Sequence, residues 1–526
     1  MDSDNLSFDD YKLFFEKDST DSWVVMHKHK EENKTDLLIY SYLSKKYCHR
    51  KCLENENLDI SIDDVIETEN ASPILVHRVF GGIKKDYWEV KEDFRIFFNL
   101  FEDKINRKFI YIDDNGDEEE VILIDDEEIK IKRWLLKEYL YAKDMVLIQF
   151  LDYFVYLDET LEELDLKKID SRVKGANFNY HLLIKNSHML FDSKAFASIK
   201  GKKITSVSDS FNSKLSNNEK KYENFIIGLD EDGAEIISTC DEKQLDRKDK
   251  TASSYFTPIF FKKEVLDRYY SYPEKYTVSD GLIRCGDLWS LRIDNSHKDV
   301  VMVLLGDLGK LTYKEQNYWR QSNIPDGKIS HSYFKRNFEA EFCDPDTADL
   351  YFKQKFDEFQ KSWYKKHGWY LFLPLNEFDK HYFETLRIPT KESQQEFDGL
   401  VLAITKIMID SLNIKELKKN LISDKSEEHL KKLVKEDFLV KDDDRSIEIL
   451  RKYLAQQGFT FPKMIEFMKN LQELRSCCTA HRKGEKYEKI KNKFNLSENY
   501  KEVFENILIE NIRILNTLSN DRYRLV

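Results

Sequence analysis

From about residue 394 to residue 526, apolar residues recur at helical spacing and proline nearly disappears. Residues spaced by three or four positions lie on one side of an amphipathic helix. The apolar positions fall into four segments: Phe397, Leu400, Val401, Ile404, Ile407, Met408 and Leu412; Ile447, Leu450 and Leu454; Met464, Ile465, Met468, Leu471 and Leu474; and Phe504, Ile507, Leu508, Ile512, Leu515 and Leu518. Gly458 is expected to end the second helix. A charged stretch, residues 422–445, separates the first two helices or forms a short one. This pattern predicts a self-contained helical bundle over residues 394–526.

The region before residue 394 has mixed character. Asn115 and Gly116 stand between two apolar runs, residues 109–112 and 121–124, which predicts a β-hairpin. Other segments are assigned by composition and periodicity: a helical region over 131–164, a surface loop over 200–222, strands over 288–293 and 300–305 joined by a polar turn, an amphipathic helix over 349–366, and a strand or extended segment over 369–374.

A chain of 526 residues is too long for one hydrophobic core. We therefore predict an α+β multidomain protein. Its parts would be a mixed α/β N-terminal domain over 1–175 with a sensor or regulatory role, an α/β middle domain over 176–393, and the helical bundle.

The formal net charge is −13, which argues against a general nucleic-acid coat protein but not against a local basic site. The first residues show neither the basic nor the apolar region of a signal peptide. No apolar run has the length needed to span a bilayer. Seven irregularly spaced cysteines fit free thiols in a reducing compartment. A cytoplasmic location without membrane attachment is expected.

The third apolar segment ends in a pair of residues with catalytic potential, Arg475 and His481, six positions apart. A chain with 12 histidines is expected to contain about one such spacing by chance, and Arg292 and His297 form a second match. That second pair falls on an expected strand and turn, where the two side chains need not converge. Arg475 instead stands at the end of a strongly amphipathic helix. A basic run follows it, comprising Arg482, Lys483, Lys486, Lys489, Lys491 and Lys493, with Tyr487 among them.

The helical region with Arg475-Ser-Cys-Cys-Thr-Ala-His481 resembles the HEPN domain, a small helical bundle common in bacterial toxins, anti-phage systems and CRISPR-associated ribonucleases. The HEPN motif is an arginine, a polar residue, and a histidine after a gap of four to six residues. Here Ser476 takes the polar place, where Asn, Asp or His is more usual. The resemblance covers about a quarter of the chain.

The resemblance implies cleavage of RNA without a metal or other cofactor. The ribose 2′-OH would attack the adjacent phosphorus and leave a 2′,3′-cyclic phosphate and a 5′-OH. His481 would position or deprotonate the nucleophile, or protonate the leaving oxygen. Arg475 would hold the phosphate and stabilise the charge of the transition state. Arg482, Lys483, Lys486, Tyr487 and Lys489 would bind RNA. HEPN sites form across a dimer, so a homodimer is implied.

The domain arrangement suggests a biological role by analogy. A free ribonuclease endangers its host, so the large preceding region is expected to sense a trigger or restrain the activity. This favours an anti-phage or abortive-infection effector, with RNA, tRNA included, as substrate and a phage-derived molecule as trigger.

Three alternatives remain open at this stage. The bundle could be a non-catalytic interaction scaffold, in which Arg475 caps its helix and His481 is an ordinary surface residue. Glu89 and Lys91 form an E-x-K pattern that, with a distant acid such as Asp64, could serve a Mg²⁺-dependent DNA nuclease. Finally, His27, His29, Cys48 and Cys52 are zinc-type donors, but their spacing is not a common zinc pattern, and free thiols with surface histidines are expected instead.

Overall fold

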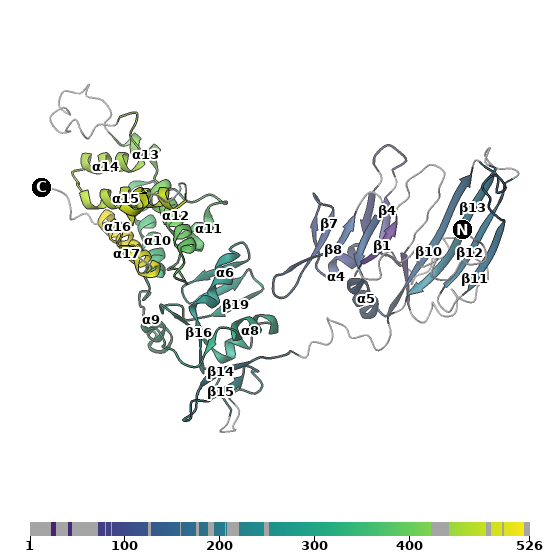
Figure 1. The fold of residues 1–526 in the computed structure, drawn as a ribbon, viewed down its shortest axis with the longest axis horizontal. Helices are drawn as coiled ribbons and strands as arrows, with labels where there is room; N and C mark the ends of the chain where they lie inside the picture. The colour runs from purple at the N-terminus through teal and green to yellow at the C-terminus, as the bar shows by residue number, and fades with distance from the viewer. Residues whose placement is uncertain are drawn as a thin grey trace. The chain divides into compact units, whose positions relative to one another are not determined.

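The computed structural model divides into two compact units, Met1–Lys220 and Lys221–Val526. The residues it describes are 23–27, 40–44, 72–78, 80–85, 87–124, 128–157, 159–174, 178–187, 194–205, 207, 220–246, 252–421, 441–479, 485–496 and 499–519. Several small antiparallel sheets occupy the N-terminal and middle regions, and the C-terminal region is mostly helical (Figure 1). The predicted α+β class is therefore confirmed.

The first unit contains a five-stranded antiparallel sheet in the order β1-β9-β8-β7-β6. Its strands are β1 (Trp23–His27), β6 (Phe101–Asp103), β7 (Lys108–Ile112), β8 (Glu118–Ile124) and β9 (Glu128–Lys132). Helices α4 (Glu92–Phe97) and α5 (Arg133–Ala142) share its core, which includes Phe94, Val121 and Leu135. The predicted hairpin joins β7 to β8. Asp113 Oδ1 accepts hydrogen bonds from the amides of Asn115 and Asp117, and Gly116 takes φ +71°.

A second sheet of the first unit has the strand order β11-β12-β13-β10-β2-β3. Its strands are β2 (Tyr40–Ser44), β3 (Ser72–Pro73), β10 (Met145–Leu157), β11 (Ile169–Lys174), β12 (Phe178–Asn186) and β13 (Ala195–Thr205); a separate pair is β4 (Leu75–Arg78) with β5 (Tyr87–Val90). The predicted helix over 131–164 is correct only as far as α5. After Asp144, which takes φ +51°, the chain becomes β10, because β10 is rich in aromatic and β-branched residues and pairs with β13 on one side and β2 on the other. Part of the expected loop over 200–222 likewise belongs to β13; residues 206 and 208–219 lie outside the described residues.

The second unit begins with small sheets around a separate core that includes Phe261, Tyr269 and Trp319. The strands are β14 (Asn224–Leu229), β15 (Glu235–Thr239), β16 (Pro258–Lys262), β17 (Tyr276–Ser279), β18 (Leu282–Cys285), β19 (Trp289–Arg292), β20 (Val300–Leu304) and β21 (Asn323–Ile324). The helical turns are η1 (Lys263–Leu266), α6 (Asp267–Ser271), α7 (Leu305–Leu308), α8 (Tyr313–Arg320), α9 (His331–Phe334) and η2 (Lys335–Glu339). Strands were predicted at 288–293 and 300–305 and are confirmed as β19 and β20, although β19 pairs with β18 and β20 pairs with β16.

The helical region of the second unit has one continuous core. Its helices are α10 (Ala348–His367), α11 (Lys380–Glu384), α12 (Gln394–Thr405), the π-helix η3 (Lys406–Asp410), α13 (Ile414–Lys419), α14 (Ser446–Gln456), α15 (Pro462–Thr479), α16 (Glu485–Lys493) and α17 (Tyr500–Ser519). The helices expected from apolar spacing are confirmed, and Gly458, with φ +87°, follows α14 as predicted. This core also includes Phe352 and Phe359 of α10, which precede residue 394 and pack together with α17. Residues 369–374 form no strand; the segment makes a single bridge, between Phe372 and Leu412.

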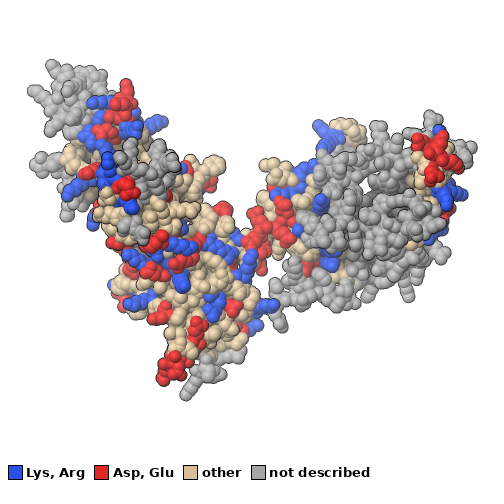
Figure 2. Space-filling model, in the orientation of Figure 1, with Lys and Arg blue, Asp and Glu red and all other residues tan. Residues whose placement is uncertain are grey.

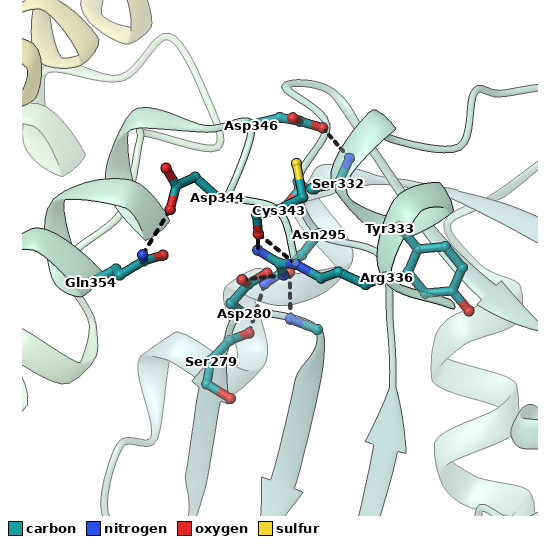
Figure 3. A network of polar contacts seen from close by, with 12 residues as sticks. Ser279, Asp280, Asn295, Ser332, Tyr333, Arg336, Cys343, Asp344, Asp346 and Gln354 are labelled. Carbon is teal, nitrogen blue, oxygen red and sulfur yellow. Dashed lines mark hydrogen bonds and ion pairs between the residues drawn. The ribbon is translucent and has the colours of Figure 1, made fainter. Parts of the chain in front are cut away.

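Polar contacts join the sheets of the second unit to its helical region (Figure 3). Arg336 donates to the carbonyl of Cys343 and pairs with Asp280 of the β17–β18 turn, with Nη1 and Oδ2 2.5 Å apart. Gln354 of α10 donates to Asp344 Oδ1 over 2.8 Å. These contacts hold the connecting segment between the small sheets and the first helix of the bundle.

No helix among the described residues combines the length and the apolar content needed to cross a bilayer.

Candidate functional site

Arg475 continues the core-facing side of α15. Met464, Met468 and Leu471 are buried, and Arg475 follows them by eleven, seven and four positions. At 3.6 residues per turn, all four positions share one side of the helix. The helix approaches the edge of the bundle here, so the Arg475 side chain is 32% exposed instead of buried. A guanidinium at this rim is anchored by the core and reachable from solvent.

Asp410 lies opposite Arg475 on a neighbouring helix. Its Oδ2 stands 3.6 Å from Arg475 Nη2, and its side chain is 38% exposed. This separation exceeds that of a direct N–H···O hydrogen bond, about 2.7–3.2 Å, so the pair is a loose electrostatic contact. The carboxylate therefore orients the guanidinium through a weak electrostatic attraction.

The π-helix η3 fixes the place of Asp410. Its wide turn buries three consecutive residues, Ile407, Met408 and Ile409, and Asp410 is the first exposed residue after them. Just beyond, the Ser411 carbonyl accepts a hydrogen bond from the Leu373 amide over 2.6 Å. Such π-turns occur frequently at functional sites. The acid is thus held on a rigid element, not on a loop.

Ser476, the predicted polar residue of the motif, is part of α15. Its hydroxyl donates to the Gln472 carbonyl over 3.0 Å, one turn earlier in the helix. The side chain is half-buried and lies about 100° around the helix from Arg475. In this geometry the hydroxyl is engaged with its own helix and keeps its lone pairs as acceptors.

The remaining predicted site residues are placed only in part. His481, Arg482 and Lys483 lie outside the described residues, so the distance from His481 to Arg475 is not defined. Lys486 and Tyr487 belong to α16, of which only the backbone is described at these positions, and Lys489 is exposed on that helix. Near its end, α16 is tied to α15, because Lys493 Nζ donates to Asn470 Oδ1 over 2.9 Å and pairs with Glu473 Oε2 at 3.6 Å.

The charge around this region is mixed. In Figure 2, basic and acidic side chains are interspersed over the helical region on the face in view, without a single basic field. A local basic segment, not the general surface, is therefore what would attract a polyanion.

The alternative metal-site residues fall partly inside and partly outside the described part of the chain. Glu89 of the E-x-K pattern pairs with Arg78 Nε at 2.7 Å across the β4–β5 pair, and Asp64 lies outside the described residues. Of the zinc-type donors, His27 is described only as backbone in β1, and His29, Cys48 and Cys52 fall outside the described part of the chain. Within that part, no three His, Cys, Asp or Glu side chains gather as a metal site would require.

The second Arg–His match, Arg292 and His297, falls on a strand end and the turn after it. Arg292 is exposed at the end of β19, whereas the His297 ring nitrogen Nδ1 accepts a hydrogen bond from the Asp299 amide over 3.2 Å, and its carbonyl accepts one from Lys263. These contacts give His297 a role in shaping the turn.

Sequence reasoning missed Asp410. Sixty-five positions separate it from Arg475, and no short motif links them. The one available signal was its place as an acidic residue within the apolar segment 397–412, and amphipathic helices commonly carry such residues.

Comparison with known proteins finds no matching protein-family model, curated protein or solved structure.

Proposed function

We propose that this chain is a metal-independent endoribonuclease of HEPN type, with Arg475, Ser476 and His481 as its site residues. The observation that carries the proposal is the setting of Arg475. Its guanidinium stands at the rim of a helical bundle, one-third exposed, with the carboxylate of Asp410 at 3.6 Å. An RNA phosphate can replace such a partner and gain two parallel hydrogen bonds from the guanidinium.

The proposed reaction is an internal transfer at phosphorus. The 2′-oxygen forms a bond to phosphorus while the bond to the 5′-oxygen breaks, which gives a 2′,3′-cyclic phosphate and a 5′-OH. Arg475 stabilises the negative charge on the non-bridging oxygens. His481 moves a proton at the 2′-hydroxyl or at the leaving oxygen, as an imidazole can near neutral pH.

The basic segment after the motif supplies RNA contacts in this proposal. Arg482, Lys483, Lys486 and Lys489 neutralise phosphates, and Tyr487 offers a ring for base stacking. Each phosphate contact releases counterions, so RNA affinity is expected to fall steeply as salt rises. The chain contains one proposed site, and a homodimer would bring two copies of it together. Light scattering of the purified protein measures whether it is a dimer.

The decisive experiment is cleavage of total RNA and of tRNA by the purified full-length protein in EDTA. Wild type is compared with Arg475→Ala and His481→Ala. Arg513→Ala serves as the matched control, because Arg513 is an exposed arginine of α17 that pairs with Glu510. Cleavage that is lost in both site variants, kept in the control and yields 2′,3′-cyclic phosphate ends supports the proposal.

Two other outcomes of this experiment would contradict the proposed activity. Cleavage that survives both substitutions moves the active site elsewhere. A homodimeric protein that binds RNA but cleaves none, with or without phage lysate as a source of trigger, favours the non-catalytic scaffold.

We further propose that the biological role is anti-phage defence by abortive infection. In this proposal, residues 1–393 bind a phage-derived trigger and restrain the ribonuclease until then. Plating of a broad phage panel on a bacterial host tests this role: protection is expected with wild type and not with Arg475→Ala. Unchanged plating across the panel would reject it.

A further inference from the structure

One face of the second sheet of the first unit gathers basic residues from three strands. Strands β10, β13, β12 and β11 lie side by side in this sheet and pair antiparallel in continuous registers (Figure 1). Successive residues of a strand alternate between the two faces of a sheet, so the register assigns each position to a face. Five of the six lysines and arginines of β11, β12 and β13 share one face, here called the basic face: Arg172, Lys174, Lys185, Lys200 and Lys202.

Four of these residues occupy two adjacent rows across the strands. Arg172 of β11 stands opposite His181 of β12, which stands opposite Lys200 of β13. The next row holds Lys174, Asn179 and Lys202. Neighbouring strands are about 4.8 Å apart, and alternate residues of one strand are about 6.7 Å apart. The backbone therefore places four basic positions within about 10 Å by about 7 Å.

The basic face contrasts with the charge of the whole chain, which is −13. On β11, β12 and β13 this face has one acidic residue, Asp170, whose Oδ1 lies 2.8 Å from Nε2 of His181. Arg172 is exposed, and the Asp170 side chain is 60% exposed, so solvent reaches this edge of the face. Five cationic residues against one carboxylate attract a polyanion.

The opposite face of the same strands is mostly apolar. Its positions on β12 are Phe178, Tyr180, Leu182, Ile184 and Asn186. Lys203 of β13 is its one lysine. An antiparallel sheet commonly packs one face on a core and leaves the other to solvent. The alternation therefore indicates that the basic face is the one that meets solvent and a partner.

Aromatic residues share the basic face. Lys185 Nζ lies 5.2 Å from the centroid of the Phe196 ring, so a cation and an aromatic ring stand together there. The register places three further aromatic positions of β10 on this face: Phe150, Phe154 and Tyr156. Cations neutralise phosphates and aromatic rings stack on bases, and proteins that bind single-stranded nucleic acid combine these two groups.

We propose that the basic face binds single-stranded nucleic acid. A duplex admits an α-helix or a two-stranded ribbon into its major groove, whereas this face is four strands wide. A single strand can lay its phosphates along the basic positions of β11 and β13 and turn its unstacked bases toward the aromatic residues. RNA and DNA both carry these groups. The binding does not depend on the proposed ribonuclease, and only a role for the strand as trigger rests on that proposal.

Fluorescence anisotropy with the full-length protein tests this binding. The probes are labelled dodecamers of 2′-O-methyluridine and of deoxythymidine, which cannot be cut through a 2′-OH, and the deoxythymidine strand paired with deoxyadenosine. Vesicles that contain phosphatidylserine serve as a different anionic surface, measured by co-sedimentation.

Three double variants separate the basic face from general charge. Arg172→Gln/Lys202→Gln removes two cations from the face. Lys194→Gln/Lys203→Gln is the matched control and removes as much charge, because Lys203 falls on the opposite face and Lys194, which pairs with Glu163, precedes β13. Arg172→Lys/Lys202→Arg keeps the charge and reports any effect of the substitutions on the fold.

The affinity of wild type for the single strands is expected to exceed that for the duplex. At about 50 mM salt it should fall about tenfold or more in Arg172→Gln/Lys202→Gln and change by less than about twofold in the control and charge-keeping variants. The slope of log affinity against log salt should become shallower by about 1.4, because each phosphate contact to a single strand contributes about 0.7. A preference for the RNA or the DNA probe identifies the ligand, and equal affinity indicates any single strand.

Four results would overturn the proposal. Neither single strand binds, or the duplex binds more tightly than both. The matched control loses as much affinity as Arg172→Gln/Lys202→Gln, which would make the effect one of general charge. The charge-keeping variant loses as much, which would make it one of structure. Vesicles bind while both oligonucleotides do not, which would make the basic face a lipid-binding surface.

Discussion

Asp410 and Arg475 face each other across two helices of the bundle, with Oδ2 and Nη2 3.6 Å apart. The aspartate ends a π-helix and the arginine ends the core-facing side of α15. Half-exposed ion pairs of this kind contribute about 0–1 kcal/mol, so the contact orients the arginine at low energy. It also places a negative charge where the proposed function requires a phosphate. Asp410 therefore helps to orient Arg475 but competes with the RNA for it.

Asp410→Asn is therefore expected to improve RNA binding. The substitution removes the competing charge and keeps the shape of the side chain, so KM for a cleavable RNA should fall about twofold to fivefold with kcat nearly unchanged. Steady-state cleavage of a labelled oligonucleotide measures both constants. Glu473→Gln is the control, because Glu473 lies about 160° around α15 from Arg475 and pairs with Lys493. A fall in kcat at constant KM would instead make Asp410 a positioning residue.

The helical region could be predicted well from the sequence because helical periodicity is local. Phe397, Met468 and Phe504 repeat at spacings set by the helix itself, and each is buried in the common core. The prediction was wrong at strand β10 for the opposite reason, because strand pairing is not local. Its partners, β2 and β13, lie about 100 residues before it and about 50 residues after it, and pairing across such separations leaves no mark in a short window.

The residues of the candidate site also differ in whether the sequence could predict them. Arg475 was found because a helix end and a motif fall together in the sequence. Asp410 was not, because its contact with Arg475 depends on which helices meet. The π-turn that exposes Asp410 also has no sequence signature, since the residues 406–410 fit an ordinary α-helix equally well.

Lys353 is expected to make stability depend on alkaline pH. Burial lowers the pKa of its ammonium group from the ordinary 10.5 to about 8. Between about pH 8 and about pH 10.5 the unfolded chain therefore binds more protons than the folded one, and the free energy of unfolding rises with pH in this window. Lys353→Met should remove that rise and stabilise the protein at neutral pH, because no charge is then buried. Urea unfolding across the window measures it.

The control for Lys353 is Lys355→Met, which affects an ammonium that pairs with Glu358 and whose pKa is raised. This variant should retain the alkaline rise. If the unfolding free energies of wild type and Lys353→Met rise in parallel through the window, the titrating group is not Lys353.

Arg268→Leu is expected to destabilise the small-sheet core of the second unit strongly. Glu315 is fully buried, and Arg268 Nη2 lies 2.8 Å from its Oε1, while Tyr269 donates to its Oε2 over 2.8 Å. Removal of the arginine leaves a buried carboxylate without a cation, which costs about 3–5 kcal/mol. Hydrogen exchange of α8 amides in increasing urea reports this core. Arg513→Leu, at an exposed pair on α17, should change stability by less than about 0.5 kcal/mol. Similar small effects of both would mean that Arg268 and Glu315 do not form this ion pair in solution.

Two glycines of the second unit should respond to alanine in opposite directions. At Gly309 an added Cβ would stand 2.1 Å from the carbonyl oxygen of Cys240, and because that oxygen belongs to the backbone it cannot rotate away. Gly309→Ala should therefore cost about 3 kcal/mol or more. At Gly399, an exposed position inside α12, nothing lies within 4 Å of an added Cβ. Alanine there restricts the unfolded chain and favours the helix, so Gly399→Ala should stabilise by about 1 kcal/mol. Urea midpoints of the two variants give the comparison. If Gly309→Ala were neutral, Cys240 and Gly309 would have to lie farther apart in solution. If Gly399→Ala were destabilising, the exposed side of α12 would have to pack against another molecule.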